Sequence, residues 1–423
     1  MPIEKSLDRK LAAIHADPHG CREFIIADAK DADMGFGIGA PGQSPERHDS
    51  EVRFKTLAQY RQQIREVIDQ AVVDIVLMSA STSELLTIQE RRFDNSPITP
   101  AARANDATDV HIHRGGRVHT SPARPFRSAS LDHMQCGHLD CEPEERHLGV
   151  DLGLYSVTFN NQLELDLDTL QQFKAFREEC EAKQFRYFLE IFDPNIPGAL
   201  APDLLPGFIN DGIARSLAGV TNAGRPTFLK MVYHGPRAME ELVRFDPHLV
   251  VGILGGSAGT TLDAFLLLHE AQKYGAKVAL YGRKINHAEH QLAFIQMLRY
   301  VADGVIEPRE AVRAYHGVLQ ELKITPNRSL EQDLTLQTNV MSYGGSSTVI
   351  DLPTAPTLSS VAIPDESPKP TAPPATVATT VAVPMVPSMS QPSSNDSPNF
   401  GKMSPHERLN YHQDRLKRLF GEK

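Results

Sequence analysis

Three short apolar runs alternate with two helical patterns over residues 225–286. The runs occupy residues 227–233, 249–254 and 277–281, and they are rich in aliphatic and β-branched side chains. Strands separated by helices of this length pair in parallel, because the helix crosses over the sheet and returns the chain in the same direction. The stretch therefore predicts a β–α–β–α–β unit and restricts the chain to an α/β fold with a parallel sheet.

A single lysine interrupts the first of these runs. Lys230 stands among Phe228, Leu229, Met231 and Val232. Burial of a lysine among apolar side chains favours its neutral amine, which is a nucleophile that can form a Schiff base with a carbonyl. The other interpretation of Lys230 is a structural ion pair.

Glycine turns follow the other two runs. The second run ends in Gly255, Gly256 and Ser257 before a helix begins, and the third ends in Gly282 and Arg283. Glycine lets the backbone approach an anion closely, and a helix N-terminus presents free N–H groups and the positive end of its dipole. Two such turns in succession are typical of the phosphate site formed by the last two loops of a TIM barrel. The other interpretation is a pair of tight turns without a ligand.

Eight strand–helix units can be counted between residues 23 and 304, which is the number that a closed barrel needs. The first five expected strands lie at residues 23–28, 74–78, 109–113, 151–159 and 186–192. The second candidate is an open doubly wound sheet, but such a sheet binds its ligand near an early glycine turn, whereas here the glycine turns come last. We therefore expect an α/β TIM barrel with an insertion near the third strand, at residues 94–147.

Acidic residues occupy two of the expected strands. Asp28 ends the first strand, and Glu190 lies inside the fifth, among apolar residues. Glu190 is either a general acid/base or the ion-pair partner of an interior lysine, and both roles would place it near Lys230.

The insertion contains two segments of interest. Residues 114–127 are basic and predict a hairpin or long loop, which either reaches over the barrel mouth to offer Arg124 or Arg127 to a second phosphate or is simply solvated. Residues 133–141 contain histidines and cysteines that could bind zinc. The gap between Cys136 and Cys141 is wider than in a CxxC pair, and no second pair follows, so we expect a structured loop without a metal.

The overall composition bounds the class of protein. The 423 residues carry a net charge of −10 at pH 7, which argues against nucleic-acid binding through bulk charge. No apolar run is long enough to span a bilayer, and the charged start MPIEKSLDRK does not read as a signal peptide. Four irregularly spaced cysteines suggest a reduced, cytoplasmic protein.

The C-terminal part differs in composition from the rest. We expect the barrel domain at residues 1–350, a disordered linker rich in proline, alanine, serine and threonine at 351–401, and a short amphipathic helix at 402–423. Ser404 and Glu407 form the pattern of a capping box at the start of this helix. A helix this short is marginal alone, so we expect it to dock on a partner, on another subunit or on the barrel.

Residues 24–286 resemble the class I aldolases of the deoxyribose-phosphate, archaeal-type fructose-bisphosphate and tagatose-bisphosphate aldolase group. The resemblance is carried by FIIADAKDA, VDIVLMSAST, VDLGLYSVTFNN, RYFLEIFDPN, FLKMVYHGP, GGSAGTT and YGRKIN. It implies a TIM barrel with Lys230 as the Schiff-base lysine and Asp28 as the acid of the first strand. It also implies phosphate contacts at Gly255, Gly256, Gly282 and Arg283. Where the fructose-bisphosphate enzymes have a tyrosine acid/base late in the fourth strand, this chain has Thr158, and Tyr155 lies three residues earlier.

The expected function is that of a lyase that cleaves or forms a C–C bond in a phosphorylated sugar without a cofactor. Lys230 would form the Schiff base, and Asp28, Glu190 or Tyr155 would move protons. We expect a small-molecule substrate, a homo-oligomer, and neither a membrane nor a nucleic acid as partner. Two alternatives remain, a sugar-phosphate-binding barrel that acts as a sensor or scaffold, and a metal-dependent lyase or isomerase that uses residues 133–141.

Overall fold

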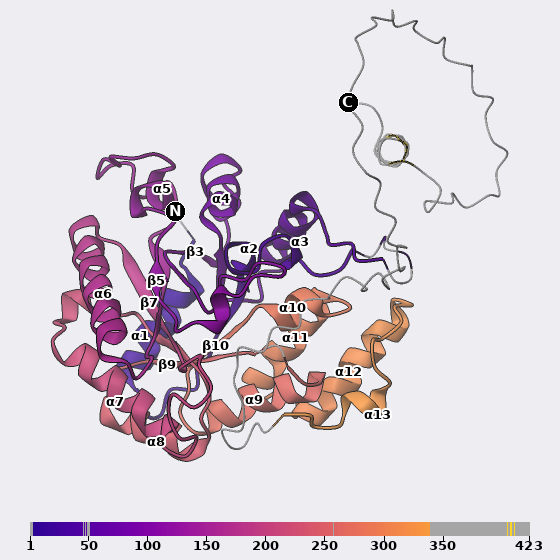
Figure 1. Ribbon diagram of the computed structural model, residues 1–423. Coiled ribbons are helices and arrows are strands. Elements are labelled where there is room, and N and C mark those ends of the chain that lie inside the picture. Colours follow the sequence, from indigo (N-terminus) through magenta and orange to yellow (C-terminus); the bar gives the residue numbers. More distant parts are fainter. Residues whose placement is uncertain are drawn as a thin grey trace, which may run out of the picture. The chain divides into compact units, whose positions relative to one another are not determined.

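Eight parallel strands close into a barrel with helices around its outside (Figure 1). The structure is a computed structural model that describes residues 3–44, 46, 48, 51–256, 258–338, 404, 407 and 410. Around the barrel the strands follow the order β1-β10-β9-β8-β7-β6-β3-β2. Their bounds are β1 Ile25–Lys30, β2 Ile75–Met78, β3 Thr99–Arg103, β6 Leu152–Thr158, β7 Arg186–Phe192, β8 Leu229–Met231, β9 Val251–Leu254 and β10 Val278–Tyr281. The predicted fold class is confirmed.

Helical segments follow every barrel strand. They are α2 Ala32–Gly35, η1 Gly37–Gly39 and α3 Leu57–Gln70 after β1; α4 Ala80–Ser83 and η2 Glu84–Gln89, a π-helix, after β2; η3 Val118–Thr120 and α5 Leu131–Cys136 after β3; α6 Leu163–Lys183 after β6; α7 Leu205–Ala218 and η4 Asn222–Gly224 after β7; α8 Pro236–Phe245 after β8; α9 Thr261–Lys273 after β9; and α10 Arg283–His287 and α11 Gln291–Ala302 after β10. Three further helices flank this set, α1 Ser6–Ala16, α12 Pro308–Glu321 and α13 Leu330–Asp333.

The third barrel strand is β3, and the prediction of a strand at residues 109–113 is wrong. Pro100 lies inside β3, and a proline, which has no N–H to donate, ordinarily argues against a central strand. Residues 109–113 belong instead to the insertion, which contains a short antiparallel pair of β4, Asp106–Ala107, with β5, Pro125–Phe126. This pair holds both ends of the long loop that the sequence predicts.

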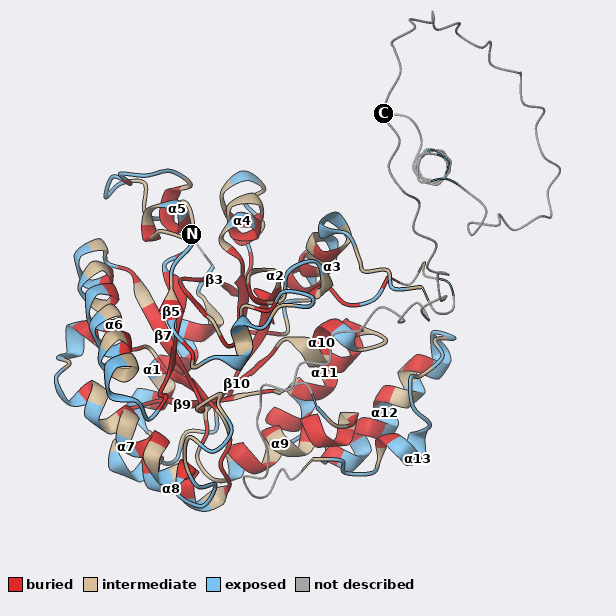
Figure 2. Ribbon diagram, viewed as in Figure 1, coloured by how far each residue is buried: buried red, intermediate tan, exposed pale blue. Residues whose placement is uncertain are grey.

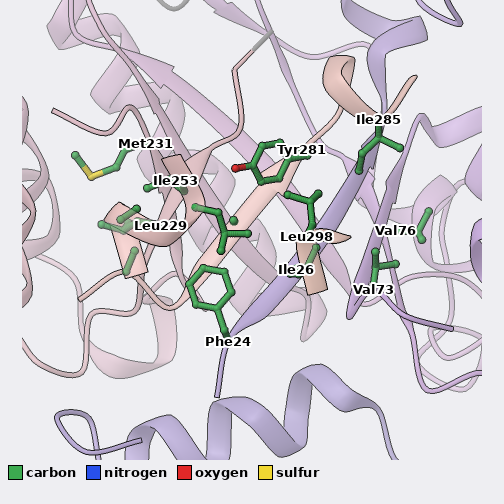
Figure 3. Packing of buried hydrophobic residues seen from close by; sticks show 14 of the residues in the cluster. Phe24, Ile26, Val73, Val76, Leu229, Met231, Ile253, Tyr281, Ile285 and Leu298 are labelled. Atoms are coloured by element: carbon green, nitrogen blue, oxygen red, sulfur yellow. The ribbon is translucent and has the colours of Figure 1, made fainter. Parts of the chain in front are cut away.

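Side chains alternate along each strand between the barrel interior and the surrounding helices. The inner cluster consists of residues such as Ile25, Ala27, Leu77, Phe188 and Phe228. The outer cluster lies between the strands and the helices and includes the neighbours of these residues along the strands. Figure 3 shows part of this cluster, with Phe24, Ile26, Val76, Leu229, Met231, Ile253, Tyr281 and Leu298 labelled. Figure 2 shows the result, strands that are buried throughout and outer helices that are buried on one side only. One residue of register therefore decides whether a side chain faces the interior or a helix.

Helix α1 packs against the inner cluster through Leu7, Leu11 and Ile14. Its Lys10 donates to the Phe24 carbonyl at 2.8 Å and is paired with Asp74, which directly precedes β2. These partners lie at the amino-terminal ends of the strands, so α1 closes that end of the barrel. The opposite end, where the strands terminate, is left for the loops.

Contacts divide the chain into two units, Met1–Leu358 and Ser359–Lys423. The expected linker at 351–401 and most of the expected helix at 402–423 lie outside the described residues. Of that helix, Ser404 and Glu407 are described and form the expected capping-box hydrogen bonds. Within the described ranges, none of the helices combines the length and apolar character needed to cross a membrane.

Candidate active site

A lysine and a glutamate form an ion pair inside the barrel near the carboxyl ends of the strands. Lys230 in β8 is in register with Glu190 in β7, which is in register with Ser156 in β6, so all three side chains face the interior. The Lys230 Nζ atom lies 2.6 Å from Glu190 Oε1, and the Ser156 hydroxyl donates to Glu190 Oε2 at 2.6 Å. Lys230 is 7% exposed and Glu190 1%. The structure thus brings together the two charged residues that the sequence places in neighbouring strands.

Arg103, at the end of β3, extends this pair into a network of buried charges. Its guanidinium lies 2.7 Å from an Asp31 oxygen, 3.4 Å from Asp106 and 4.0 Å from Glu190. Burial alone lowers the pKa of Arg103, but the three carboxylates outweigh it and the pKa is raised, so the guanidinium stays charged. The single cation therefore holds three carboxylates in place above the interior core.

A cavity of about 90 Å³ opens above the Lys230–Glu190 pair. Its apolar wall comes from Phe36, Val110, Phe192, Leu254 and Leu280, and its polar wall from Asp31, Arg103, Glu190, Lys230 and Arg283. Gly255, Gly256 and Gly282 complete the lining. A small polar substrate would meet the lysine at the bottom of this cavity and the glycine turns at its side.

The two glycine turns need glycine for steric reasons. A Cβ atom on Gly255 would lie 2.2 Å from the Tyr281 ring, and one on Gly282 would lie 2.7 Å from the Ala29 carbonyl oxygen. Gly256 has a φ of +62°, in the left-handed region that favours glycine. Ser257, the remaining expected phosphate contact, lies outside the described residues.

Arg283 lies beside these turns as the sequence predicts. Its guanidinium stacks over the Phe36 ring at 5.3 Å, and burial lowers the pKa of Arg283. A half-buried cation next to two glycine turns is a suitable environment for a phosphate.

The N-terminus of α9 is already satisfied by side chains of the protein. Thr260 and Asp263 form a capping box, and the Thr261 N–H donates to the Asp333 carboxylate at 2.8 Å. A phosphate at this end of the barrel would therefore have to use the glycine turns and Arg283 rather than the first free amides of α9, which corrects the helix-terminus part of the expectation.

Asp28 lies on the other side of its strand from the site. It is in register with Val76 and Tyr281, which belong to the outer cluster, and its carboxylate is 3.3 Å from Lys30. Burial raises the pKa of Asp28 to about 6, although Lys30 opposes this. The structure therefore does not bring Asp28 to Lys230. The acid that reaches the cavity is Asp31, which directly follows β1.

Tyr155 is likewise placed outside the barrel. It is in register with Leu189 of the outer cluster, and its ring stacks on Phe176 at 4.2 Å and lies 5.5 Å from Phe173, both in α6. This corrects the expectation that Tyr155 moves protons at the site. Its neighbour Ser156 is the residue of β6 that contacts Glu190.

The basic loop does not bring Arg127 to the mouth. Arg127 pairs with Glu179 of α6 at 2.5 Å and lies over the Phe176 ring. Arg124 is exposed and donates its backbone N–H to Thr108. The loop backbone is bound near the carboxyl ends of β6 and β7, where the Ala123 N–H donates to Asn160 and the Asn195 side chain donates to the Ser121 carbonyl. Neither arginine lines the cavity, which favours the second interpretation, a solvated basic loop.

The sequence interpretation missed three site residues, Arg103, Asp31 and Asp109. Arg103 was missed because no strand was predicted at residues 99–103. Asp31 was missed because the first strand was predicted to end at Asp28. The Asp109 carboxyl is delivered by the insertion and accepts a hydrogen bond from Thr158 at the end of β6 at 3.1 Å. A charged residue directly after a small-residue run such as TPAA was the available signal for Arg103.

The pH dependence of stability should report on Asp109. Burial raises the pKa of Asp109 to about 6, and the charge of Glu190 adds to the effect. A carboxyl whose pKa is higher in the folded than in the unfolded state stabilises the fold fully below pH about 4, and this contribution is lost as pH rises through about 6. Asp109→Asn should therefore flatten the fall in unfolding free energy over this range and raise stability at pH 7 by about 1–3 kcal/mol.

Urea unfolding at a series of pH values checks this expectation. Burial also raises the pKa values of Asp28 and Asp33 to about 6 and the pKa of Asp106, so the variant should lose only part of the wild-type slope. The exposed Asp211 of α7 provides the control, and Asp211→Asn should leave the slope unchanged. An unchanged slope in Asp109→Asn would contradict the proposed protonation.

Comparison with known proteins places the chain by its fold. No family model matches the sequence, and no curated protein matches it significantly. A fructose-bisphosphate aldolase from Slackia heliotrinireducens DSM 20476 superposes with a TM-score of 0.51 at 11% identity, covering 74% of this chain and 91% of that one. An archaeal fructose 1,6-bisphosphate aldolase superposes with a TM-score of 0.49 at 14% identity, covering 71% and 100% of the two chains. At 11% identity the similarity to the Slackia enzyme establishes the barrel fold alone, and at that level the expected resemblance is confirmed.

Proposed function

We propose that this protein is a lyase of the class I aldolase kind, which cleaves or forms a C–C bond beside a carbonyl of a phosphorylated sugar through a Schiff base on Lys230. The observation that carries the proposal is the Lys230–Glu190 pair, 2.6 Å apart at the bottom of a cavity whose side is formed by two glycine turns and Arg283. A structural ion pair alone would not require a cavity above it.

The first chemical step uses the pair directly. Glu190 accepts a proton from the Lys230 ammonium, and the neutral amine attacks the substrate carbonyl carbon. The resulting carbinolamine loses its hydroxyl as water, with the proton returned by Glu190, and leaves an iminium. Ser156 and Arg103 hold Glu190 in position for both transfers.

The second step breaks the C–C bond. A base removes the proton of the hydroxyl two carbons from the iminium, the bond between the carbons breaks, and its electron pair moves into the iminium to form an enamine. We assign this proton transfer to Asp109, because its Oδ1 atom has no hydrogen-bond partner among the described residues and its pKa is raised to about 6. Asp31 remains the partner of Arg103.

The glycine turns and Arg283 account for a phosphorylated substrate. A phosphate held at Gly255, Gly256 and Gly282 with Arg283 beside it would fix the reacting carbonyl over the lysine. This positioning supplies much of the rate gain of a two-step covalent mechanism. Because these positions are glycines, a phosphate can approach the backbone N–H groups of the two turns. A larger residue at Gly255 or Gly282 would not fit, because its Cβ atom would collide with Tyr281 or Ala29.

Intact-mass analysis after borohydride treatment tests the proposal. The protein is incubated with a panel of ketose phosphates and aldehyde phosphates, reduced, and mapped by peptide. An adduct on Lys230 is expected for at least one compound and would identify the substrate class. No adduct with any of them, combined with thermal stabilisation by a sugar phosphate, would replace the proposal with a non-catalytic binding protein.

A further inference from the structure

A group of metal-ligating side chains lies in the insertion, outside the candidate active site. The Cys136 Sγ atom, a ring nitrogen of His138 and a Glu145 carboxylate oxygen all lie within 4.8 Å of one another. The buried Cys141 thiol lies close enough to the Cys136 thiol for the two groups to interact. Three donors, of sulfur, nitrogen and oxygen, thus converge within ten positions of the sequence, and Cys141 supplies a fourth beside them.

The ring nitrogen of His138 that faces this group is available as a ligand. His138 Nδ1 lies 2.8 Å from the Leu139 carbonyl oxygen, which can only accept, so Nδ1 carries the ring hydrogen. The lone pair is then on Nε2, which lies 3.4 Å from Glu145 Oε1. A ligating histidine usually donates its other N–H to a carbonyl or carboxylate in this way, because the hydrogen bond fixes the tautomer and the ring orientation.

The backbone holds the ligands in place without a metal. Gly137 and Asp140 both have positive φ, 87° and 56°, so the chain turns twice between the first and the last cysteine. The backbone of Asp140 and Cys141 lies beside the Asp132 carboxylate, which is not itself one of the four donors. The two turns and this carboxylate thus shape the loop in the absence of a metal.

The loop is also attached firmly to the barrel. Gly149 and Val150 donate to the Gln135 and Met134 carbonyls at 2.7 and 2.9 Å, and Lys183 at the end of α6 pairs with Asp132 at 2.5 Å. These bonds place the end of α5 beside the amino-terminal end of β6, which begins at Leu152.

This position separates the group from the candidate active site. Lys230 and Glu190 lie at the level of Ser156, toward the other end of the barrel, and β6 spans about 20 Å from end to end. A metal held here could not act on a carbonyl bound at Lys230, which argues against the alternative of a metal-dependent lyase built on residues 133–141. A structural role remains.

We propose that Cys136, His138, Cys141 and Glu145 form a structural zinc site that ties the insertion together. Thiolate, imidazole and carboxylate donors suit Zn²⁺, which takes four such ligands in a tetrahedron. Tetrahedral ligands around zinc lie about 3.3–3.8 Å apart, so the three donors within 4.8 Å of one another need only small side-chain rotations, and the Cys141 thiol has to turn from the Glu142 carbonyl toward them. Cys136 and Cys141 are buried, whereas His138 and Glu145 have exposed side-chain fractions of 55% and 37%, so an ion can enter from the solvent side. The proposal replaces the expectation of incidental cysteines.

Metal analysis of the full-length protein tests this site. The protein is purified under reducing conditions, equilibrated with Zn²⁺ and dialysed, and its zinc content is measured by mass spectrometry. About one zinc per chain is expected for the wild type. Cys136→Ser and His138→Ala should lower zinc affinity by more than about 100-fold, because even a residue that only supports a ligand contributes 10- to 100-fold.

Matched variants separate loss of a ligand from loss of the fold. Cys21→Ser and His19→Ala change residues of the same types elsewhere and should keep one zinc per chain. His138 is exposed, so His138→Ala should leave the circular dichroism spectrum and the thermal midpoint of the zinc-free protein unchanged.

Replacement of zinc by Co²⁺ gives a second readout. In the wild type we expect thiolate-to-cobalt charge-transfer absorption and the intense visible bands of a tetrahedral site. In Cys136→Ser and Cys141→Ser we expect the charge-transfer band to be lost. Three results would each overturn the proposal. The wild-type protein could hold no zinc above background after equilibration, or its zinc content could be unaffected by Cys136→Ser and His138→Ala. The third is a Cys136–Cys141 disulfide in the freshly isolated protein.

Discussion

Lys230→Met is expected to abolish borohydride-trapped imine and to lower C–C bond cleavage by at least about 10⁴-fold, which is the scale of loss when a covalent nucleophile is removed. The reason is chemical rather than structural, because methionine has nearly the length of lysine but has no amine. The measurements are intact mass after reduction and single-turnover cleavage of the substrate that labels the wild type.

The matched control for this variant is Lys10→Met. Lys10 is also buried and paired with a carboxylate, Asp74 at 2.9 Å, but it lies in α1 at the closed end of the barrel. Lys10→Met removes a buried ion pair of the same kind and should keep the full imine signal. Trapping that persists in Lys230→Met, or that disappears in both variants, would show that Lys230 is not the reacting group.

Arg103→Met is expected to destabilise the protein by about 3–5 kcal/mol, the cost of leaving buried carboxylates without their cation. Arg103 is the guanidinium that lies within 4.0 Å of Asp31, Asp106 and Glu190. Without it, Asp31 and Asp106 must either remain charged in a dry environment or take up a proton, whereas Glu190 keeps its pair with Lys230. Urea unfolding at pH 7 gives the change in unfolding free energy directly.

Two observations distinguish this effect from a general loss of an arginine. Arg127→Met, which removes the partly exposed pair with Glu179, should cost at most about 1 kcal/mol. The penalty of Arg103→Met should also shrink as the pH falls, because protonation removes the uncompensated charges. Equal costs for the two variants, or a penalty independent of pH, would contradict the central role given to Arg103.

Much of the barrel could be predicted from the sequence, because its determinants are local. Apolar runs of four to seven residues alternate with helical patterns, and seven of the eight strands follow from this alternation. β3 did not, since Pro100 and two alanines weaken its strand signal and its place in the sheet is decided by β2 and β6 on either side.

The site divides in the same way. Lys230 and Glu190 could be predicted because a charge in an otherwise apolar strand stands out, and the glycine turns because glycine is required where a side chain would collide with Tyr281 or with the Ala29 backbone. Asp28 and Tyr155 were placed wrongly because the side-chain period of a strand is two, and a misjudgement of one residue moves a side chain from the interior to the helix layer.

The sequence by itself thus determined the fold class and the presence of a lysine and a carboxylate on neighbouring strands, since each depends on residue type at a strand position. The tertiary structure alone decided which acids share the site. Asp31, Arg103 and Asp109 come from segments up to 78 positions apart, and only closure of the barrel with its insertion brings their charges together with Glu190. The reason is that burial energies act between neighbours in space, and the pattern along the chain contains no information about which distant charge will be that neighbour.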